Sequence, residues 1–93
     1  MYSFEWDDGK NRINREKHGV SFEEAQTVFY DENAWLEYDE GHSEVEDRFR
    51  LLGCSYIGNL LIVVHCIRAG DIIRIISSRK ATAKESREYE RRL

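Results

Sequence analysis

The stretch from Leu60 to Ala81, LLIVVHCIRAGDIIRIISSRKA, decides the fold of this chain. Two runs of apolar and β-branched residues, Leu60–Ile67 and Ile72–Ser77, flank the tetrapeptide Arg68-Ala69-Gly70-Asp71. A glycine beside an aspartate between two such runs predicts a β-hairpin, because glycine takes the positive φ angles that a tight turn needs. Both runs are nearly continuous in apolar residues, so we expect central strands rather than an exposed edge pair.

The hairpin also predicts a register. If Ile67 pairs with Ile72, His65 lies opposite Arg74 on one face of the sheet. The remaining members of that face are Leu61, Val63, Ile76 and Ser78. The other face is apolar and is expected to be the core; it carries Leu60, Ile62, Val64, Cys66, Ile73 and Ile75. A slip of one residue would exchange the two faces.

The N-terminal part of the chain predicts a short strand and a polar helix. Tyr2–Trp6 alternates and contains aromatic residues, which favours a short strand, with a position at the sheet edge left open. Asp7 or Asp8 can cap a helix through Gly9–His18, with Ile13 as its main apolar anchor. Gly19 is expected to end this helix in the left-handed conformation.

A second helix follows. Ser21-Phe22-Glu23-Glu24 is a capping box, and the helix is expected to reach about Phe29 or Tyr30. Its core stripe is Phe22, Ala25, Val28 and Phe29. The next elements are a turn at Asp31–Asn33, a strand at Ala34–Tyr38 and a polar loop at Asp39–Val45.

The remaining elements complete an α+β pattern. Asp47–Ile57 predicts a strand, and pairing of Ile57 with Leu60 would set Arg50 opposite Ile67 and Leu52 opposite His65. Thr82-Ala83-Lys84-Glu85 is a second capping box, opening a helix to about Leu93. We therefore expect a mostly antiparallel sheet of about four strands, with two N-terminal helices and one C-terminal helix packed against one face. The uncovered face would be cationic.

Composition and charge bound the class of protein. The 93 residues are enough for one domain, spanning 1–93, with a modest core. The absence of a signal-peptide layout and of an apolar run of roughly 20 residues predicts a cytoplasmic protein. Cys54 and Cys66 are expected on opposite sides of the sheet, so we predict no disulfide, and neither belongs to a metal-ligand pattern.

The net charge of −4 conceals an asymmetry. Residues 1–47 contain fourteen acidic and four basic residues, a balance of −10, whereas residues 48–93 contain four acidic and ten basic residues, a balance of +6. This split predicts two surfaces with different partners. The basic half suits a polyanion, and the acidic half suits a basic protein or is simply solvated.

The predicted sheet face gathers the groups that could carry chemistry. Its members are Arg48, Arg50, His65 and Arg74, with Glu46 and Arg79 at strand ends and Tyr89 on the last helix. Arginine forks can hold an RNA backbone and stabilise charge in a phosphorane-like transition state. RNA cleavage beside a 2′-hydroxyl needs a base, an acid and cations but no metal or other cofactor. The proton carriers would be His65, Glu46 and Tyr89; alternatively, the arginines pair with acidic neighbours and His65 is a core histidine.

The other histidines suggest less. Lys17 and His18 before Gly19 suit the end of a helix, because cations stabilise its negative dipole end. His42 sits in an acidic loop, and three histidines without a repeating spacing make a poor metal site. The sequence contains no phosphate loop, dinucleotide fingerprint, nucleophile elbow or zinc ribbon.

An ordered set of short motifs covers nearly the whole chain. It consists of Phe4-Glu5-Trp6-Asp7, Lys10, Asn14, Lys17-His18-Gly19-Val20, Phe22-Glu23-Glu24-Ala25, Phe29-x-Asp31, Glu46-x-Arg48, Gly53, Arg68, Arg74-Ile75-Ile76-Ser77-x-Arg79-x-Ala81-Thr82, Glu85 and Tyr89. In this set the chain resembles the BrnT toxin family. It departs from the family pattern at Ser78, where alanine is expected, and at Ser86, where arginine is expected.

The resemblance implies a small ribonuclease toxin of a type II toxin–antitoxin pair, with a RelE-like fold. Its implied partner is a BrnA-type antitoxin with a ribbon-helix-helix domain, which would form a heterotetramer with it and bind operator DNA on behalf of the complex. The implied catalytic residues are Arg48, Arg68, Arg74, Arg79, Glu46, His65 and Tyr89. RNA binding is expected to involve Arg50, Lys80 and Arg87. The alternatives are a non-catalytic co-repressor module that binds the antitoxin, a decayed toxin, or an orphan nucleic-acid binder.

Overall fold

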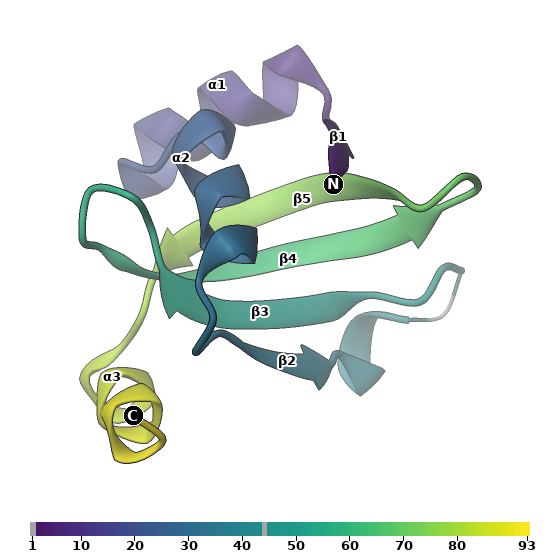
Figure 1. The fold of residues 1–93 in the computed structure, drawn as a ribbon. Helices are drawn as coiled ribbons and strands as arrows, with labels where there is room; N and C mark the ends of the chain where they lie inside the picture. The colour runs from purple at the N-terminus through teal and green to yellow at the C-terminus, as the bar shows by residue number, and fades with distance from the viewer. Residues whose placement is uncertain (1, 44) are drawn as a thin grey trace.

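The fold is described by a computed structural model over residues 2–43 and 45–93. These residues form a sheet of five strands in the order β1-β5-β4-β3-β2, with helices around it (Figure 1). The elements along the chain are β1 (Ser3–Glu5), α1 (Asp8–His18), α2 (Phe22–Thr27), η1 (Val28–Tyr30), β2 (Trp35–Tyr38), η2 (Glu40–His42), β3 (Phe49–Cys54), β4 (Leu60–Arg68), β5 (Ile72–Lys80) and α3 (Ala83–Arg91). The α+β prediction is confirmed. The sheet has five strands rather than about four, and the strand predicted within Tyr2–Trp6 forms as the edge strand β1, which pairs parallel to β5 and makes the sheet mixed.

The β4–β5 hairpin forms where it was predicted, but the predicted register is wrong by one residue. Arg68 pairs with Ile72, so His65 lies opposite Ile75 and Arg74 lies opposite Cys66. The reason is the loop, which contains three residues and has positive φ at both Gly70 and Asp71. A bulge then follows, because His65 pairs with Ile75 and Val64 with Ser77, which leaves Ile76 without a partner.

The slip inverts the faces of β4 relative to β5, so the predicted core face is wrong for Leu60, Ile62, Val64 and Cys66, whereas Ile73 and Ile75 of β5 lie in the core as predicted. The main core lies between the sheet and the N-terminal helices, and its sheet residues are Leu51, Leu61, Val63, Ile73 and Ile75. The helical side contributes Phe22, Ala25 and Val28, three of the four residues of the predicted stripe, as fully buried side chains. In Figure 1, α1, α2 and η1 lie over this face of the sheet.

The β3–β4 connection also differs from the prediction. Cys54, not Ile57, pairs with Leu60, so β3 ends three residues earlier than expected. The turn that follows is closed by Ser55 N, which donates to Asn59 O at 2.8 Å. A buried carboxylate anchors this turn to α2, because Glu24 Oε2 accepts from Ser55 Oγ at 2.7 Å and from Asn59 Nδ2 at 2.8 Å.

Only half of the predicted capping box at the start of α2 is therefore present. Ser21 Oγ accepts from the backbone N–H of Glu24 at 3.0 Å, as predicted. The Glu24 carboxylate does not return to the backbone of Ser21; it holds the β3–β4 turn instead. The Glu24 side chain, which would have completed the local capping box, therefore makes a long-range contact instead.

The caps of α1 are confirmed, but its predicted anchor is wrong. Asp7 caps the helix by accepting from Lys10 N, and Gly19 ends it with φ of 69°. Ile13 is 55% exposed, whereas Asn11 and Asn14 are buried. The Asn14 amide donates to Ser78 O at 2.8 Å and accepts from Ser78 N at 3.1 Å, so it completes the edge of β5 as a neighbouring strand would.

Helix α3 covers part of the other face, which contradicts the prediction that all helices share one face. Thr82 and Glu85 form the predicted capping box. Tyr89 packs with Leu52 and Ile62 in a second, smaller cluster. The guanidinium of Arg92 lies 3.1 Å from the centre of the Trp35 ring, which holds the end of α3 against β2.

Both cysteines are free thiols. Contrary to the prediction they lie on the same face, because Cys54 pairs with Leu60 and Leu60 shares a face with Cys66. They are nevertheless far apart along the strands, since six residues separate Leu60 from Cys66.

Candidate functional site

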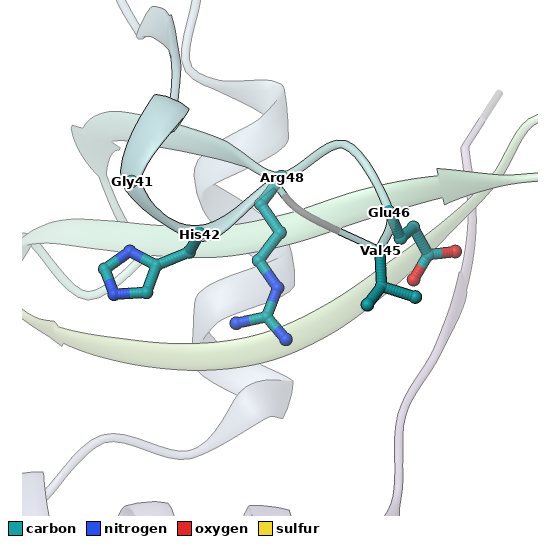
Figure 2. Close-up of a pocket in the computed structure, with 5 residues that line it drawn as sticks. All are labelled: Gly41, His42, Val45, Glu46 and Arg48. Atoms are coloured by element: carbon teal, nitrogen blue, oxygen red, sulfur yellow. The ribbon is translucent and has the colours of Figure 1, made fainter.

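Two adjoining hollows lie on the face of the sheet opposite α1 and α2. The first has a volume of about 370 Å³ and is lined by Gly41, His42, Val45, Glu46 and Arg48 (Figure 2). The second has a volume of about 260 Å³ and is lined by Asp39, His42, Arg48, Arg50, Ile62, Val64, Ser77 and Arg79. Because His42 and Arg48 line both, we treat the two as one site, called the arginine hollow below.

The strand register builds the floor and walls of the arginine hollow. Arg50 pairs with Val64, and Val64 pairs with Ser77, so these residues form one row across β3, β4 and β5. Ile62 and Arg79 are paired in the next row of the same face. Apolar side chains therefore form the floor between guanidinium groups, which lowers the local dielectric and strengthens any contact to an anion.

The loop before β3 forms the rim of the arginine hollow. Asp39 N donates to Arg48 O at 2.8 Å, and Arg48 N donates to Ser43 Oγ at 3.0 Å. Ser43 Oγ in turn donates to Asp39 O at 2.6 Å. These bonds close the loop at its base and carry η2 over the sheet. Figure 2 shows the His42 ring and the Arg48 side chain extending from this loop across the strands, with Glu46 on the other side of Arg48.

His42 is fixed by its own loop. Its Nδ1 lies 3.1 and 3.2 Å from the two carboxylate oxygens of Asp39. The Asp39 side chain is only 11% exposed, whereas that of His42 is 70% exposed. A buried carboxylate thus orients an exposed imidazole whose other nitrogen, Nε2, has no hydrogen-bond partner among the described residues.

Most arginines of this face are paired with carboxylates. Arg50 pairs with Glu37 on the neighbouring strand, and Arg79 pairs with Glu85 at the start of α3. Near the β4–β5 hairpin, Arg68 lies 3.4 Å from Glu46 and Arg74 lies 2.9 Å from Glu5. Within residues 2–43 and 45–93, Arg48 has no carboxylate at ion-pair distance.

The pair between Arg79 and Glu85 is bidentate. Arg79 donates to the two carboxylate oxygens at 2.8 and 3.1 Å and to Lys80 O at 3.2 Å. Hydrogen bonds from Arg79 hold the pKa of Glu85 at about 2. A guanidinium has five N–H donors, so this arrangement orients Arg79 and leaves two donors unused.

The structure brings together four of the residues predicted for the site. Arg48, Arg50, Arg79 and Glu46 line the arginine hollow. Arg68 is near it through its ion pair with Glu46. Arg74 is on the same face, opposite Cys66, but does not line either hollow.

His65 lies on the other face, in the core, so its predicted position beside Arg74 is wrong. It is 2% exposed, its Nδ1 lies 3.1 Å from Val63 O, and its ring packs edge-on against Phe29 and stacks on Phe49. Burial lowers the pKa of His65, because the charged form would lose its hydration. Its surroundings are those of the core histidine that the sequence left open as the alternative.

Tyr89, Lys80 and Arg87 do not line the arginine hollow. Tyr89 is 7% exposed and donates to Asp31 Oδ2 at 2.6 Å; burial and this bond raise the pKa of Tyr89 to about 12. Lys80 pairs with Leu61, a core residue, so its side chain leaves the sheet on the face opposite Arg79. Arg87 is exposed on α3.

Three polar residues of the arginine hollow were not predicted: Asp39, His42 and Ser77. The sequence carries one usable signal, an aspartate three residues before a histidine in a loop that leads into an arginine-bearing strand. That spacing suits a short 3₁₀ turn, in which residues three apart lie on the same side. Ser77 enters the hollow only because of the bulge at Ile76, for which the sequence has no local signal.

Three ion pairs join the acidic and the basic half of the sequence. The carboxylates of Glu5, Glu37 and Glu46 come from the acidic half, and each pairs with an arginine of the basic half. Among the described residues, three of the fourteen acidic side chains in the first half are thus neutralised by arginines of the second half.

The described residues contain neither a cluster of metal ligands nor a membrane-spanning helix. Across residues 2–43 and 45–93, no three His, Cys, Asp or Glu side chains are grouped so that they could hold a metal ion. None of the helices in this part of the chain has the length and apolar character needed to span a bilayer.

The fold and the hollow define a small α+β protein whose sheet presents arginines at a concave site, and comparison with known proteins gives the class. A family model described as the ribonuclease toxin BrnT of type II toxin–antitoxin systems matches residues 6–85. The chain therefore belongs to the BrnT family, which confirms the resemblance seen in the sequence. A family of this kind implies an antitoxin partner.

A solved structure supports the fold. The crystal structure of the Brucella abortus ribonuclease toxin BrnT matches with a TM-score of 0.69 at 20% sequence identity, covering 88% of this chain and 99% of the other. At that identity the likeness establishes the shared fold. No curated protein sequence matches the chain.

Proposed function

We propose that this chain is a metal-independent endoribonuclease that binds RNA in the arginine hollow, cuts it and so inhibits translation. The observation that carries the proposal is the convergence of Arg48, Arg50 and Arg79 on one hollow with an apolar floor. A phosphodiester bound there would meet several guanidinium donors at once. Such donors stabilise the extra negative charge that develops on phosphorus oxygens during cleavage.

The chemistry that suits this site uses the RNA's own 2′-hydroxyl as nucleophile. The guanidinium groups supply the positive charge that a metal ion supplies in other nucleases, which is the reason for proposing metal independence. Arg79 is held in place by Glu85 and keeps two donors free, so little reorganisation is needed when a phosphate arrives. Arg48 has no competing carboxylate among the described residues and is the natural first contact.

The partner and setting follow from the family. We propose a BrnA-type ribbon-helix-helix antitoxin that neutralises the chain in a heterotetramer, with operator DNA contacted by the antitoxin. The toxin would act in the cytoplasm as a single domain of residues 1–93. A neighbouring reading frame that encodes a ribbon-helix-helix protein would support this part of the proposal, and a genomic context without one would count against it.

The test of the enzyme is direct. Purified chain is incubated with end-labelled RNA in the presence of EDTA, and the products are separated by length. We expect fragments that end in a 2′,3′-cyclic phosphate, and Arg48→Gln and Arg79→Gln should each slow cleavage by about 100-fold.

The matched control is Arg12→Gln, which removes an exposed arginine of α1 outside the hollow and should leave the rate unchanged. Intact RNA after incubation with folded wild-type chain would refute the nuclease. Growth arrest on expression without antitoxin, relieved by Arg79→Gln, is the corresponding result in cells.

A non-catalytic role as an antitoxin-binding co-repressor is favoured by a different observation. Arg50, Arg68, Arg74 and Arg79 are each engaged by a carboxylate, as expected if they serve the fold alone. In that case the chain would bind the antitoxin and alter its repression, yet cleave no RNA. The RNA assay above separates the two roles.

A further inference from the structure

His42 is the one histidine whose ring lies at the arginine hollow, and the proposed function does not yet use it. It lines both parts of the hollow together with Arg48. The other two histidines are elsewhere: His65 is buried in the core, and His18 is the last residue of α1, outside the lining of the hollow. A proton carrier that must reach a bound RNA is therefore found only at position 42 among the histidines.

The contact with Asp39 sets the chemistry of the His42 ring. With Nδ1 at 3.1 and 3.2 Å from the Asp39 oxygens, the neutral imidazole keeps its proton on Nδ1 and donates it to the carboxylate. Nε2 is then the unprotonated nitrogen, which can accept a proton from a substrate hydroxyl. The carboxylate also stabilises the imidazolium that forms when Nε2 is protonated.

The surroundings of the pair keep it in place. The backbone of Asp39 is held by two hydrogen bonds, from its N–H to Arg48 O and from Ser43 Oγ to its carbonyl oxygen. Among the described residues its carboxylate bonds only to His42. These same bonds tie the base of the loop to Arg48, the arginine that lines both parts of the hollow. Since His42 and Arg48 both line the two parts of the hollow, an RNA phosphate bound by Arg48 would lie in the same hollow as the His42 ring.

We propose that His42 is the general base that activates the 2′-hydroxyl of the bound RNA, and that Asp39 is its positioning residue. The inference rests on the proposed ribonuclease function and deepens it. Nε2 of His42 takes the proton of the 2′-hydroxyl, and O2′ forms a bond to phosphorus. The bond from phosphorus to O5′ breaks, and the leaving oxygen takes a proton from a water molecule. The products are a 2′,3′-cyclic phosphate and a 5′-hydroxyl end.

The experiment separates proton transfer from RNA binding. Cleavage of end-labelled RNA is measured at saturating enzyme, and affinity is measured with an RNA whose 2′-hydroxyl at the cleavage site is replaced by hydrogen. His42→Ala should slow cleavage by about 100-fold, while affinity for the uncleavable RNA stays within about twofold of wild type. Added imidazole should restore part of the lost rate. His18→Ala is the matched control and should cleave at the wild-type rate.

Asp39→Asn keeps an oxygen near His42 but removes the charge. We expect about tenfold slower cleavage at saturation, with unchanged RNA affinity and no rescue by imidazole, because the base is still present. A His42→Ala variant that cleaves like wild type, or that loses affinity as much as rate, would overturn the inference and leave the nuclease standing. Wild-type chain that cleaves no RNA would overturn both.

Discussion

On the face of the sheet that α1 and α2 cover, polar groups are buried and bonded, whereas on the face of the arginine hollow charged groups meet each other in solvent. Asn14, Glu24 and Ser78 are nearly inaccessible, and in the described residues no buried side-chain nitrogen or oxygen lacks a partner. The ion pair between Arg50 and Glu37 is instead 39% and 49% exposed. Buried hydrogen bonds are costly to break, and exposed ion pairs contribute little to stability.

This contrast separates where the chain is held together from where it can act. Removing a contact from the covered face should cost folding free energy. Removing a carboxylate from the open face, which is the face that carries the arginine hollow, should cost little stability and change the affinity for an anion.

The largest effect on stability is expected at Asn14. Asn14→Ala removes the amide that donates to Ser78 O and Val20 O and accepts from Ser78 N, all at 2.8–3.1 Å. Three buried backbone groups then lack partners, which should lower the free energy of unfolding by about 3 kcal/mol. Urea denaturation measures it. Ile13→Ala on the same helix is the control and should change stability by less than about 0.5 kcal/mol, because Ile13 is 55% exposed.

A smaller loss of stability is expected from substitution of Gly53, where β3 packs against η1. A Cβ at this position would lie 2.7 Å from Val28 Cγ1 and 2.9 Å from Ala34 Cβ, closer than packed carbon atoms tolerate. Gly53→Ala should destabilise the fold by about 2 kcal/mol through overpacking. Gly41→Ala, in the loop on the open face, has its nearest atom at 3.8 Å and should be neutral.

The overpacking at Gly53 has its own check. Val28→Ala removes the methyl group that an added Cβ would meet. If overpacking is the cause, the double variant Gly53→Ala/Val28→Ala should lose less stability than the sum of the two single variants. Strict additivity would contradict this explanation.

The core position of His65 predicts a dependence of stability on pH. Burial lowers the pKa of His65 below its usual 6.5 in the folded chain, so on acidification the unfolded chain takes up the proton first. Its contribution is complete above about pH 6.5 and is lost as the pH falls toward the folded pKa. Each pKa unit by which the folded and unfolded chains differ changes the free energy of unfolding by about 1.4 kcal/mol.

The pH range over which stability is lost distinguishes His65 from the carboxyl groups. The pKa values of Glu23, Asp31 and Glu85 are lowered in the folded chain, so their contributions are lost only in more acidic solution. The free energy of unfolding of the wild type should therefore be lower at pH 5.5 than at pH 7.5, and this difference should shrink in His65→Gln. An unchanged difference in that variant would mean that His65 does not carry the effect.

The features that the sequence predicted correctly are those decided by neighbouring residues. Gly19 ends α1, and Thr82 and Glu85 cap α3, because caps depend on residues within one helical turn. The hairpin is also local, but its register depends on whether three or four residues form the loop. That single residue places His65 in the core, whereas Arg74 stays on the face where it was predicted.

The site was predicted in part for the same reason. Arg48 and Arg50 share a face in any straight strand, so their convergence is visible in the sequence. Arg79 joins them only through the bulge at Ile76, and His42 only through a loop whose base is closed by Arg48 O. Neither the bulge nor the loop closure has a signal in adjacent residues.

The smallest effect on stability is expected from a substitution on the open face. Glu37→Gln removes the carboxylate paired with Arg50 in a solvent-exposed pair, so stability should change by less than about 1 kcal/mol. The affinity for RNA should rise, because a negative charge next to the hollow is gone. At a separation of about 6 Å in water one unit charge is worth roughly 0.7 kcal/mol, or about threefold in affinity.

Two controls identify the cause of that gain in affinity. Glu16→Gln removes an exposed acidic residue of α1 that has no ion pair among the described residues and should leave affinity nearly unchanged. In the double variant Glu37→Gln/Arg50→Gln the gain should disappear, because Arg50 is the group that the carboxylate neutralises. Raising the salt concentration should reduce the gain as well, since phosphate contacts weaken when counterions compete. If Glu37→Gln lowers affinity instead, the pair orients Arg50 toward RNA rather than competing for it, and the open face would then resemble the covered one in depending on its internal contacts.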